Sequence, residues 1–193
     1  MSAIDLAAVL PGFDDPAFDA QAVFRAALQA LSRPGILVDC GRAAPYSALY
    51  SLGLALLDQD TGVWVSPAAR SLAASLRFHT GCALVDDCAS ADYLLVGAVN
   101  EMPALDRLAL GSDEAPHRSA TLIVEVDELS ADGGWTLSGP GIPGTARLNV
   151  PALGAAFLAE WQANARSFPR GVDLFLCCGG RLCGLPRTTR IEG

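Results

Sequence analysis

Residues 63–98 read VWVSPAARSLAASLRFHTGCALVDDCASADYLLVGA, and this stretch decides the fold class. A strand pattern at 63–65 is followed by a helix that begins at Ser66-Pro67 and runs toward Phe78. The remaining strand patterns of the stretch lie at 83–85 and 93–98. Strands that alternate with helices are typical of an α/β sheet with helices on its faces.

A further helix is predicted before this stretch. Asp15-Pro16 supplies an N-cap and a proline in the first turn, which is a common beginning of a helix. Phe24, Leu28 and Leu31 recur at helical spacing and are expected to form one apolar face. The other elements expected in this half are a turn at 32–35, a strand at 36–38 and a helix at 49–57.

The second half is richer in hairpin signals. Residues 120–126 form the clearest strand pattern, and Gly133-Gly134 predicts a turn into a hairpin partner at 135–137. A closing hairpin is predicted from 172–177 and 182–185. A short helix is expected from Pro103, and a long helix is expected from Pro151. We therefore predict a three-layer α/β fold, with a mixed β-sheet flanked by helices, in one domain spanning 1–193.

The composition excludes several classes of function. The chain has 193 residues and a net charge of −8, and all 13 of its basic residues are arginines. Without lysine it cannot form a Schiff base with pyridoxal phosphate, and it lacks the lysine with which a Walker A loop binds phosphate. Its negative charge disfavours nucleic acid and anionic membranes.

No targeting or membrane segment is expected either. The apolar runs are far shorter than the ~18 residues of a membrane-spanning helix. The first arginine is Arg25, so no basic region precedes apolar residues as in a signal peptide. These features predict a cytoplasmic protein.

The six cysteines do not suggest a metal site. They form no C-x-x-C pair, and two histidines are present to complete a site. Cys177, Cys178 and Cys183 fall in the predicted closing hairpin, where reduced thiols pack as small apolar side chains. We expect no metal and no other cofactor.

Two arginine-containing segments are candidates for a site. Arg77 and His79 end a predicted helix, where they either contact an anion together or merely satisfy the last carbonyls. Arg187, Thr188 and Thr189 follow the last predicted strand and either bind an oxyanion or form an exposed basic tail. Our hypothesis is that all five residues line one anion-binding or partner-docking patch.

Two loops are less decisive. Residues 139–142 read GPGI, which either brings backbone N–H groups close to an anion or forms a plain turn. Asp173 follows a turn at 168–172 and could organise that turn through its carboxylate. Neither a G-x-S-x-G nor an H-E-x-x-H motif is present, and no base–nucleophile pair can be named around His79. No catalytic residue is assigned.

The same segments resemble one family, the H subunit of the bacterial carbon–phosphorus lyase complex (the PhnH family). The resemblance covers nearly the whole chain and is specific because its short motifs occur in order at similar spacing. The motifs are SRPG at 32–35, LLDQDTGVW at 56–64, SLRFHT at 75–80, GPGI at 139–142, FPRGVD at 168–173 and PRTT at 186–189.

The resemblance implies a fold like the large domain of pyridoxal-phosphate-dependent transferases, without the cofactor. It also implies a role in alkylphosphonate catabolism as an accessory subunit, homodimeric alone and assembled with the G, I and J subunits. There it would support transfer of phosphonate to the ribose of ATP and dock with the J lyase subunit. The alternative is a standalone small transferase or hydrolase that acts on a phosphorylated nucleotide.

Overall fold

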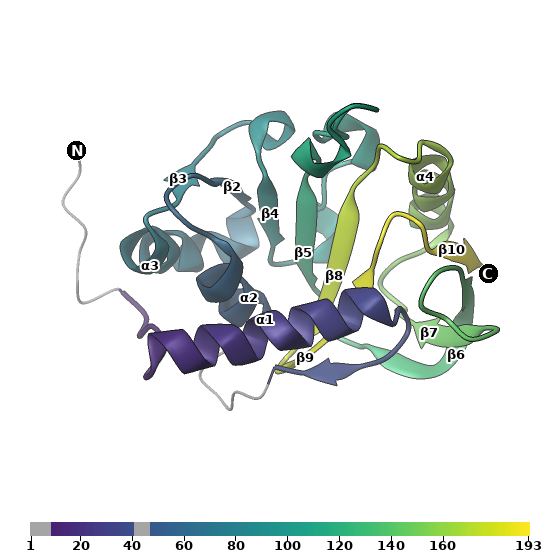
Figure 1. Cartoon of the computed structure of the whole chain (residues 1–193), viewed down its shortest axis with the longest axis horizontal. Helices are drawn as coiled ribbons and strands as arrows, with labels where there is room; N and C mark the ends of the chain where they lie inside the picture. Colours follow the sequence, from purple (N-terminus) through teal and green to yellow (C-terminus); the bar gives the residue numbers. More distant parts are fainter. Residues whose placement is uncertain (1–8, 41–46) are drawn as a thin grey trace.

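A seven-stranded mixed sheet runs through the centre of the molecule (Figure 1). The computed structural model describes residues 9–40 and 47–193. The strand order is β1-β9-β8-β5-β4-β2-β3; β3, β2, β4, β5 and β8 are parallel, whereas β9 is antiparallel to both β8 and β1. The strands are β1 Val38–Asp39, β2 Gly62–Val65, β3 Ala83–Leu84, β4 Tyr93–Val96, β5 Thr121–Glu125, β8 Asp173–Cys178 and β9 Arg181–Leu185. The predicted mixed α/β sheet is confirmed.

Helices cover both faces of this sheet, as predicted. Three helices lie on one face: α1 Pro16–Ser32, α2 Ala48–Leu56 and α3 Arg70–Thr80. The other face carries α4 Ala155–Arg166 and a three-stranded antiparallel sheet, β10-β6-β7 (Figure 1). The strands of this small sheet are β6 Ser130–Ser138, β7 Ala146–Asn149 and β10 Arg190–Glu192. Short 3-10 turns are η2 Pro67–Ala69, η3 Cys88–Ser90, η4 Val99–Glu101, η5 Leu105–Arg107 and η6 Pro116–Arg118.

The central strands are apolar throughout because both of their faces are buried. Along β5, Leu122 and Val124 pack toward α4 and the small sheet, whereas Ile123 packs toward α1, α2 and α3. All three side chains are fully buried. This is the burial expected of a parallel sheet covered on both sides.

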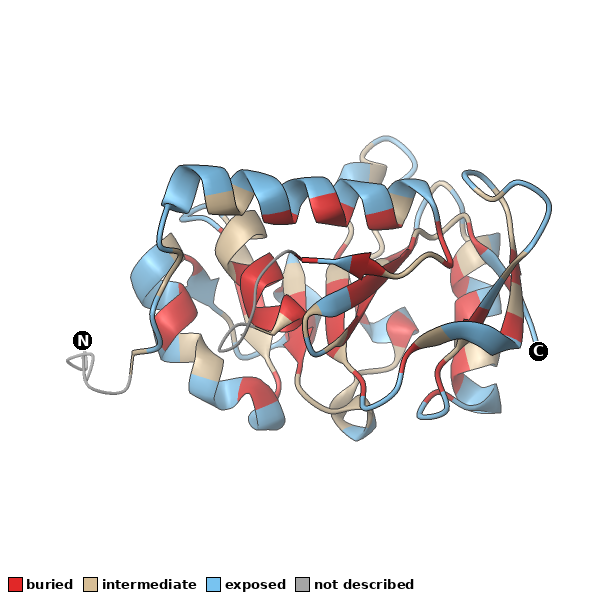
Figure 2. Cartoon of the chain, turned by 90° about the horizontal axis from the view of Figure 1, so that it is seen from below, coloured by how far each residue is buried: buried red, intermediate tan, exposed pale blue. Residues whose placement is uncertain are grey.

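Helix α1 buries a different face from the predicted one. Its buried residues are Val23, Ala26, Ala27 and Ala30, whereas Phe24 and Leu28 are 47% and 52% exposed. The outward side of α1 is exposed along its length (Figure 2). A Cβ on Gly184 of β9 would lie 2.7 Å from the backbone of Ala30, so the helix approaches the sheet too closely for large side chains.

The beginning of α3 also differs from the prediction. Ser66 makes no side-chain capping bond to η2 or α3. Instead its hydroxyl donates to Glu101 Oε2 at 2.6 Å, and the same oxygen accepts the Ala68 N–H at 2.8 Å. The carboxylate of Glu101 therefore accepts a backbone N–H at this helix beginning, where we expected the Ser66 side chain to act as the cap.

The predicted Gly133-Gly134 turn is wrong. Both glycines have positive φ, as a turn would need, but they lie within β6, where the register with β7 shifts. A Cβ on Gly134 would lie 2.5 Å from Leu148 O, so the glycine permits a close strand approach. Strand β6 pairs with β7 and not with β5.

Smaller differences concern the ends and lengths of elements. The helix expected from Pro103 is the single 3-10 turn η5, and the helix expected from Pro151 begins at Ala155. Strand β10 was not predicted. The strand expected at 36–38 is β1, which begins at Val38. The closing hairpin is confirmed as β8 and β9. In the part of the chain that the structure describes, no helix is long and apolar enough to cross a membrane.

Candidate functional site

Arg187 forms the most extensive polar network in the described structure. Its guanidinium binds the carboxylate of Asp173, with Nη2–Oδ2 at 2.6 Å and Nε–Oδ1 at 3.2 Å. The other N–H groups donate to Ser119 Oγ at 2.5 Å and to the carbonyls of Pro116 and Pro169 at 3.1 and 3.2 Å. All five guanidinium donors are thereby satisfied.

This network has a structural consequence. The side chains of Arg187 and Asp173 are only 13% and 23% exposed, so the ion pair is largely removed from water. It ties the segment after β9 to the beginning of β8 and to the turn before β5. Asp173 also accepts the Arg187 backbone N–H at 2.7 Å. We expected the Asp173 carboxylate to organise the turn at 168–172, but it binds residue 187 instead, and the Arg187 guanidinium contacts that turn at the Pro169 carbonyl.

The two threonines that follow Arg187 differ in burial. Thr188 is half-buried, and its carbonyl lies against Gly139. Thr189 is fully buried; its carbonyl accepts the indole N–H of Trp161 at 2.9 Å, and its N–H donates to Pro186 O. Its hydroxyl has no hydrogen-bond partner among the described residues. Thr189 is therefore part of the protein interior, whereas Thr188 lines a shallow surface cavity, and the segment does not form a fully exposed tail.

The GPGI loop packs against two other segments of the resemblance. A Cβ on Gly141 would meet Ser32 O at 2.1 Å, and a Cβ on Gly139 would meet Thr188 O at 2.9 Å. The loop therefore lies between the end of α1 and the segment 186–189. We call this contiguous set of segments, 32–35, 139–142, 168–173 and 186–189, the motif seam. In it the glycines allow close backbone packing.

Arg77 and His79 lie elsewhere, in the last turn of α3. His79 Nε2 is 2.8 Å from Leu10 O and donates to it, and the ring packs edge-on against Phe78. Leu10 N–H also donates to Ser75 Oγ at 2.9 Å, so α3 anchors the segment around residue 10. Arg77 is exposed on this helix end.

The structure does not bring the five candidate residues together. Helix α3 leads into β3, the edge strand, whereas Arg187 is paired with the first residue of β8. Four strand spacings separate β3 from β8, which corresponds to about 19 Å. The predicted patch is therefore divided into the motif seam and a separate α3 end. Whether either one serves an anion or a partner stays a prediction.

Asn164 is a structural residue that the sequence analysis missed. Its amide forms a reciprocal pair with Val172, at 2.8 Å to the N–H and 2.9 Å to the carbonyl. It thereby holds the loop between α4 and β8. The signal was present, because Phe157, Trp161 and Asn164 follow one another at helical spacing and all are buried.

The carboxyl edge of the parallel strands is acidic. A shallow cavity there is lined by Glu125 at the end of β5, by Asp127 just after it and by residues 97–100 beyond β4. Burial raises the pKa of Glu125, which accepts the Gly179 N–H at 3.1 Å. Ligands of open α/β sheets commonly bind at this edge, but two carboxylates do not suit an anion.

All six cysteines are free thiols, and all except the partly buried Cys178 are buried. Burial, with a contribution from the charge of Asp39, raises the pKa of Cys40 to about 12. Burial also raises the pKa of Cys183 to about 11 and that of Cys177 well above its usual value. Among the described residues, no group of three or more His, Cys, Asp or Glu side chains could hold a metal ion.

Two exposed apolar features stand out on the surface. One is the α1 stripe, formed by Phe24 and Leu28, which lie one helical turn apart and are 47% and 52% exposed; Phe18, 72% exposed, lies near the beginning of the same helix. The other is Phe168, 63% exposed, which lies in the motif seam beside a shallow cavity lined by His117 and Thr188. Large exposed apolar side chains that cluster mark interaction surfaces.

Comparison with known proteins agrees with the resemblance found in the sequence. Residues 11–192 match the family described as "Bacterial phosphonate metabolism protein (PhnH)". The chain belongs to the PhnH family. It is 40% identical, over 93% of its length and 94% of the relative's, to the "Alpha-D-ribose 1-methylphosphonate 5-triphosphate synthase subunit PhnH" of Rhizobium meliloti (strain 1021). It is 32% identical, over 89% and 85% of the two chains, to the "Putative C-P lyase subunit protein HtxG" of Stutzerimonas stutzeri.

Proposed function

We propose that this chain is an accessory subunit of the carbon–phosphorus lyase machinery, acting in bacterial alkylphosphonate catabolism. The observation that carries the proposal is the full-length match to the PhnH family, with 40% identity to a protein named as a subunit of ribose 1-methylphosphonate 5-triphosphate synthase. A second relative is also named as a subunit, of C-P lyase. In this role the chain supports the transfer of phosphonate to the ribose of ATP.

We propose that its partners are the G, I and J subunits, in the cytoplasm, and that the isolated chain is a homodimer. The α1 stripe supports a homodimer because Phe24 and Leu28 lie one helical turn apart and are about half exposed. Two copies of a helix can bury such a stripe against each other across a two-fold axis.

The proposed fold relationship is with the large domain of pyridoxal-phosphate-dependent transferases, as one α/β domain. The seven-stranded mixed sheet between helices supports it. The residues do not fit the cofactor itself. The carboxyl ends of β5 and β8 carry Glu125 and Cys178, and the chain has no lysine to form an imine.

The assembly proposal is tested by pull-down of the tagged chain from its own phosphate-starved cells grown on methylphosphonate. Recovery of the G, I and J subunits is expected. Recovery of a homodimer alone, while those subunits are expressed, would contradict the proposal and favour the standalone transferase or hydrolase. Turnover of ATP or of a ribose phosphonate by the isolated chain would favour that alternative directly.

The dimer surface is tested separately with Leu28→Glu, which places a charge in the α1 stripe. Light scattering after size-exclusion chromatography is expected to show a dimer for the wild type and a monomer for this variant. Gln29→Glu adds the same charge at the next, exposed position of α1 and is expected to leave the dimer intact. A dimeric Leu28→Glu protein would show that the stripe is not the interface.

A further inference from the structure

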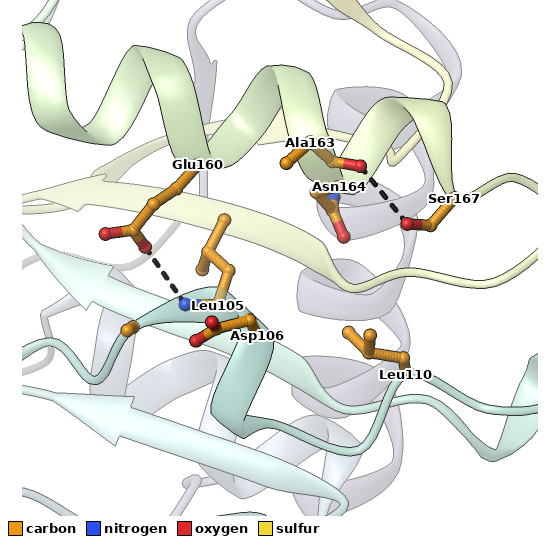
Figure 3. A pocket seen from close by; sticks show the side chains of 8 residues that line it. Leu105, Asp106, Leu110, Glu160, Ala163, Asn164 and Ser167 are labelled. Atoms are coloured by element: carbon orange, nitrogen blue, oxygen red, sulfur yellow. Dashed lines mark hydrogen bonds between the residues drawn. The ribbon is translucent and has the colours of Figure 1, made fainter.

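A small apolar pocket lies between the 3-10 turn η5 and helix α4 (Figure 3). Its volume is about 190 Å³. Leu105 and Leu110 form one wall, and Ala163 on α4 forms the opposite wall. The floor is held by structural bonds, because Asn164 is paired with Val172 and the Leu110 carbonyl accepts the Gly171 N–H at 2.9 Å. The pocket is therefore built into the fold.

The size of the pocket restricts its occupant. Sites for drug-sized ligands and cofactors generally have volumes of about 300–1,000 Å³. An apolar cavity of about 150 Å³ takes up one benzene molecule. A nucleotide does not fit a pocket of about 190 Å³, whereas one aromatic ring or one branched aliphatic side chain does.

The rim of the pocket is acidic. Asp106 is exposed on η5, and Glu160 projects from α4 on the same side (Figure 3). Glu160 Oε2 accepts the Leu105 N–H at 3.0 Å, which fixes the carboxylate at the pocket edge. Within the described residues neither carboxylate forms an ion pair. A cation next to the apolar group would complement both charges.

We infer that this pocket is a docking site for one side chain of a partner protein: an apolar side chain with an arginine or lysine beside it. The pocket buries the apolar group, and Asp106 and Glu160 bind the cation. Exposed Phe168 follows directly after Ser167, which lines the pocket, so the contact extends from the pocket onto the motif seam. This inference rests on the proposed function, because the partner would be a subunit of the same complex.

Helix α4 offers a matched pair of variants for a test. Ala163 lines the pocket and Ala159 does not, although both are exposed and lie one turn apart. Ala163→Trp fills the pocket, whereas Ala159→Trp adds the same bulk next to it. Asp106→Arg reverses one rim charge, and Asp132→Arg makes the same change at an exposed position of β6. Thermal unfolding of each variant verifies that it is folded.

Each variant is co-purified with the G, I and J subunits, and its affinity for the assembled subunits is measured. We expect Ala163→Trp to weaken binding about thirtyfold, as loss of a buried interface anchor does. Asp106→Arg is expected to weaken it about tenfold, with reduced salt dependence. The two control variants are expected to bind as the wild type does.

The outcomes separate this inference from the proposed function. If the wild type binds none of the subunits, the proposed function is overturned and the inference with it. If the wild type binds and Ala163→Trp binds equally well, the docking site alone is overturned. If Ala163→Trp loses binding and Asp106→Arg does not, the apolar anchor is supported and the cation is refuted.

Discussion

Replacing Arg187 by methionine is the most informative change to the motif seam. Methionine keeps much of the side-chain volume but removes all five donors. Asp173 would retain only the backbone N–H of residue 187, and its carboxylate would stay largely buried without a cation. The carbonyls of Pro116 and Pro169 would lose the guanidinium as well.

The size of the effect follows from the burial of the pair. Removing one partner of a buried ion pair costs about 3–5 kcal/mol of unfolding free energy, because an uncompensated charge remains. The side chains of Arg187 and Asp173 are 13% and 23% exposed, so solvent relieves part of this cost. We expect about 3 kcal/mol. For a domain of this size that corresponds to a decrease in Tm of about 6–12 °C.

The assay is urea and thermal unfolding of the wild type and two variants. The control is Arg170→Ala, which breaks an arginine–aspartate pair of the same kind on the surface. That pair joins Arg170 Nε to Asp113 Oδ1 at 3.3 Å, with side chains 51% and 71% exposed. An exposed pair contributes about 0–1 kcal/mol, so the control is expected to unfold nearly as the wild type does.

A second comparison identifies the cause of the loss. The double variant Arg187→Met with Asp173→Asn removes the orphaned charge, so it is expected to be more stable than Arg187→Met alone. If Arg187→Met and Arg170→Ala lowered the unfolding free energy equally, the view of Arg187 as a buried structural clamp would be wrong. Arg187 would then be available to a ligand or partner.

Three further predictions follow from packing and titration. Gly184→Ala is expected to lower Tm because its Cβ would meet the α1 backbone at 2.7 Å, whereas Gly154→Ala, which meets nothing within 4 Å, is expected to be neutral in the same thermal scan. Hydrogen bonds from the Ser66 hydroxyl and from the Ala68 N–H lower the pKa of Glu101. The ionised carboxylate therefore stabilises the folded protein fully above the ordinary carboxyl pKa, and this stabilisation is lost as the pH falls through the lowered pKa. The stability difference between the wild type and Glu101→Gln, measured by urea unfolding, should therefore shrink on acidification, and a constant difference would contradict this. Because the pKa of Cys40 is raised to about 12, this thiol should resist alkylation at pH 8 until the chain unfolds, as peptide mass mapping would show.

The elements with strong local signals could be predicted from the sequence. The strand at 120–126 carries several β-branched residues and appears as β5. The closing hairpin has a glycine pair at its turn, 179–180, and appears as β8 with β9. The buried face of α1 could not be predicted in this way. Its alanines are buried because Gly184, more than 150 residues later, lets β9 approach the helix backbone. The space between α1 and the sheet is too narrow for large apolar side chains, so Phe24 and Leu28 face outward.

The glycine pair in β6 shows a second limit of local patterns. Gly133 and Gly134 do have the left-handed φ values that a turn signal implies, 77° and 63°. The strand pairing around them is set by β7, because Gly134 is packed against the Leu148 carbonyl. The positive φ values of the two glycines were thus predictable. That they form a bulge inside a strand and not a turn depends on pairing with β7, which the local sequence does not specify.

The sequence identified the polar residues of the candidate site but not their contacts with one another. The sequence singled out Arg187 for its donors and Asp173 for its carboxylate, yet only the fold shows that each satisfies the other. An anion that bound Arg187 would have to displace Asp173 and release several loops at once. Arg187, Asp173 and the glycines of the motif seam therefore hold the fold together. Phe168, the α1 stripe and the pocket beside α4 face outward, and they are the surfaces that we propose for contacts with partners.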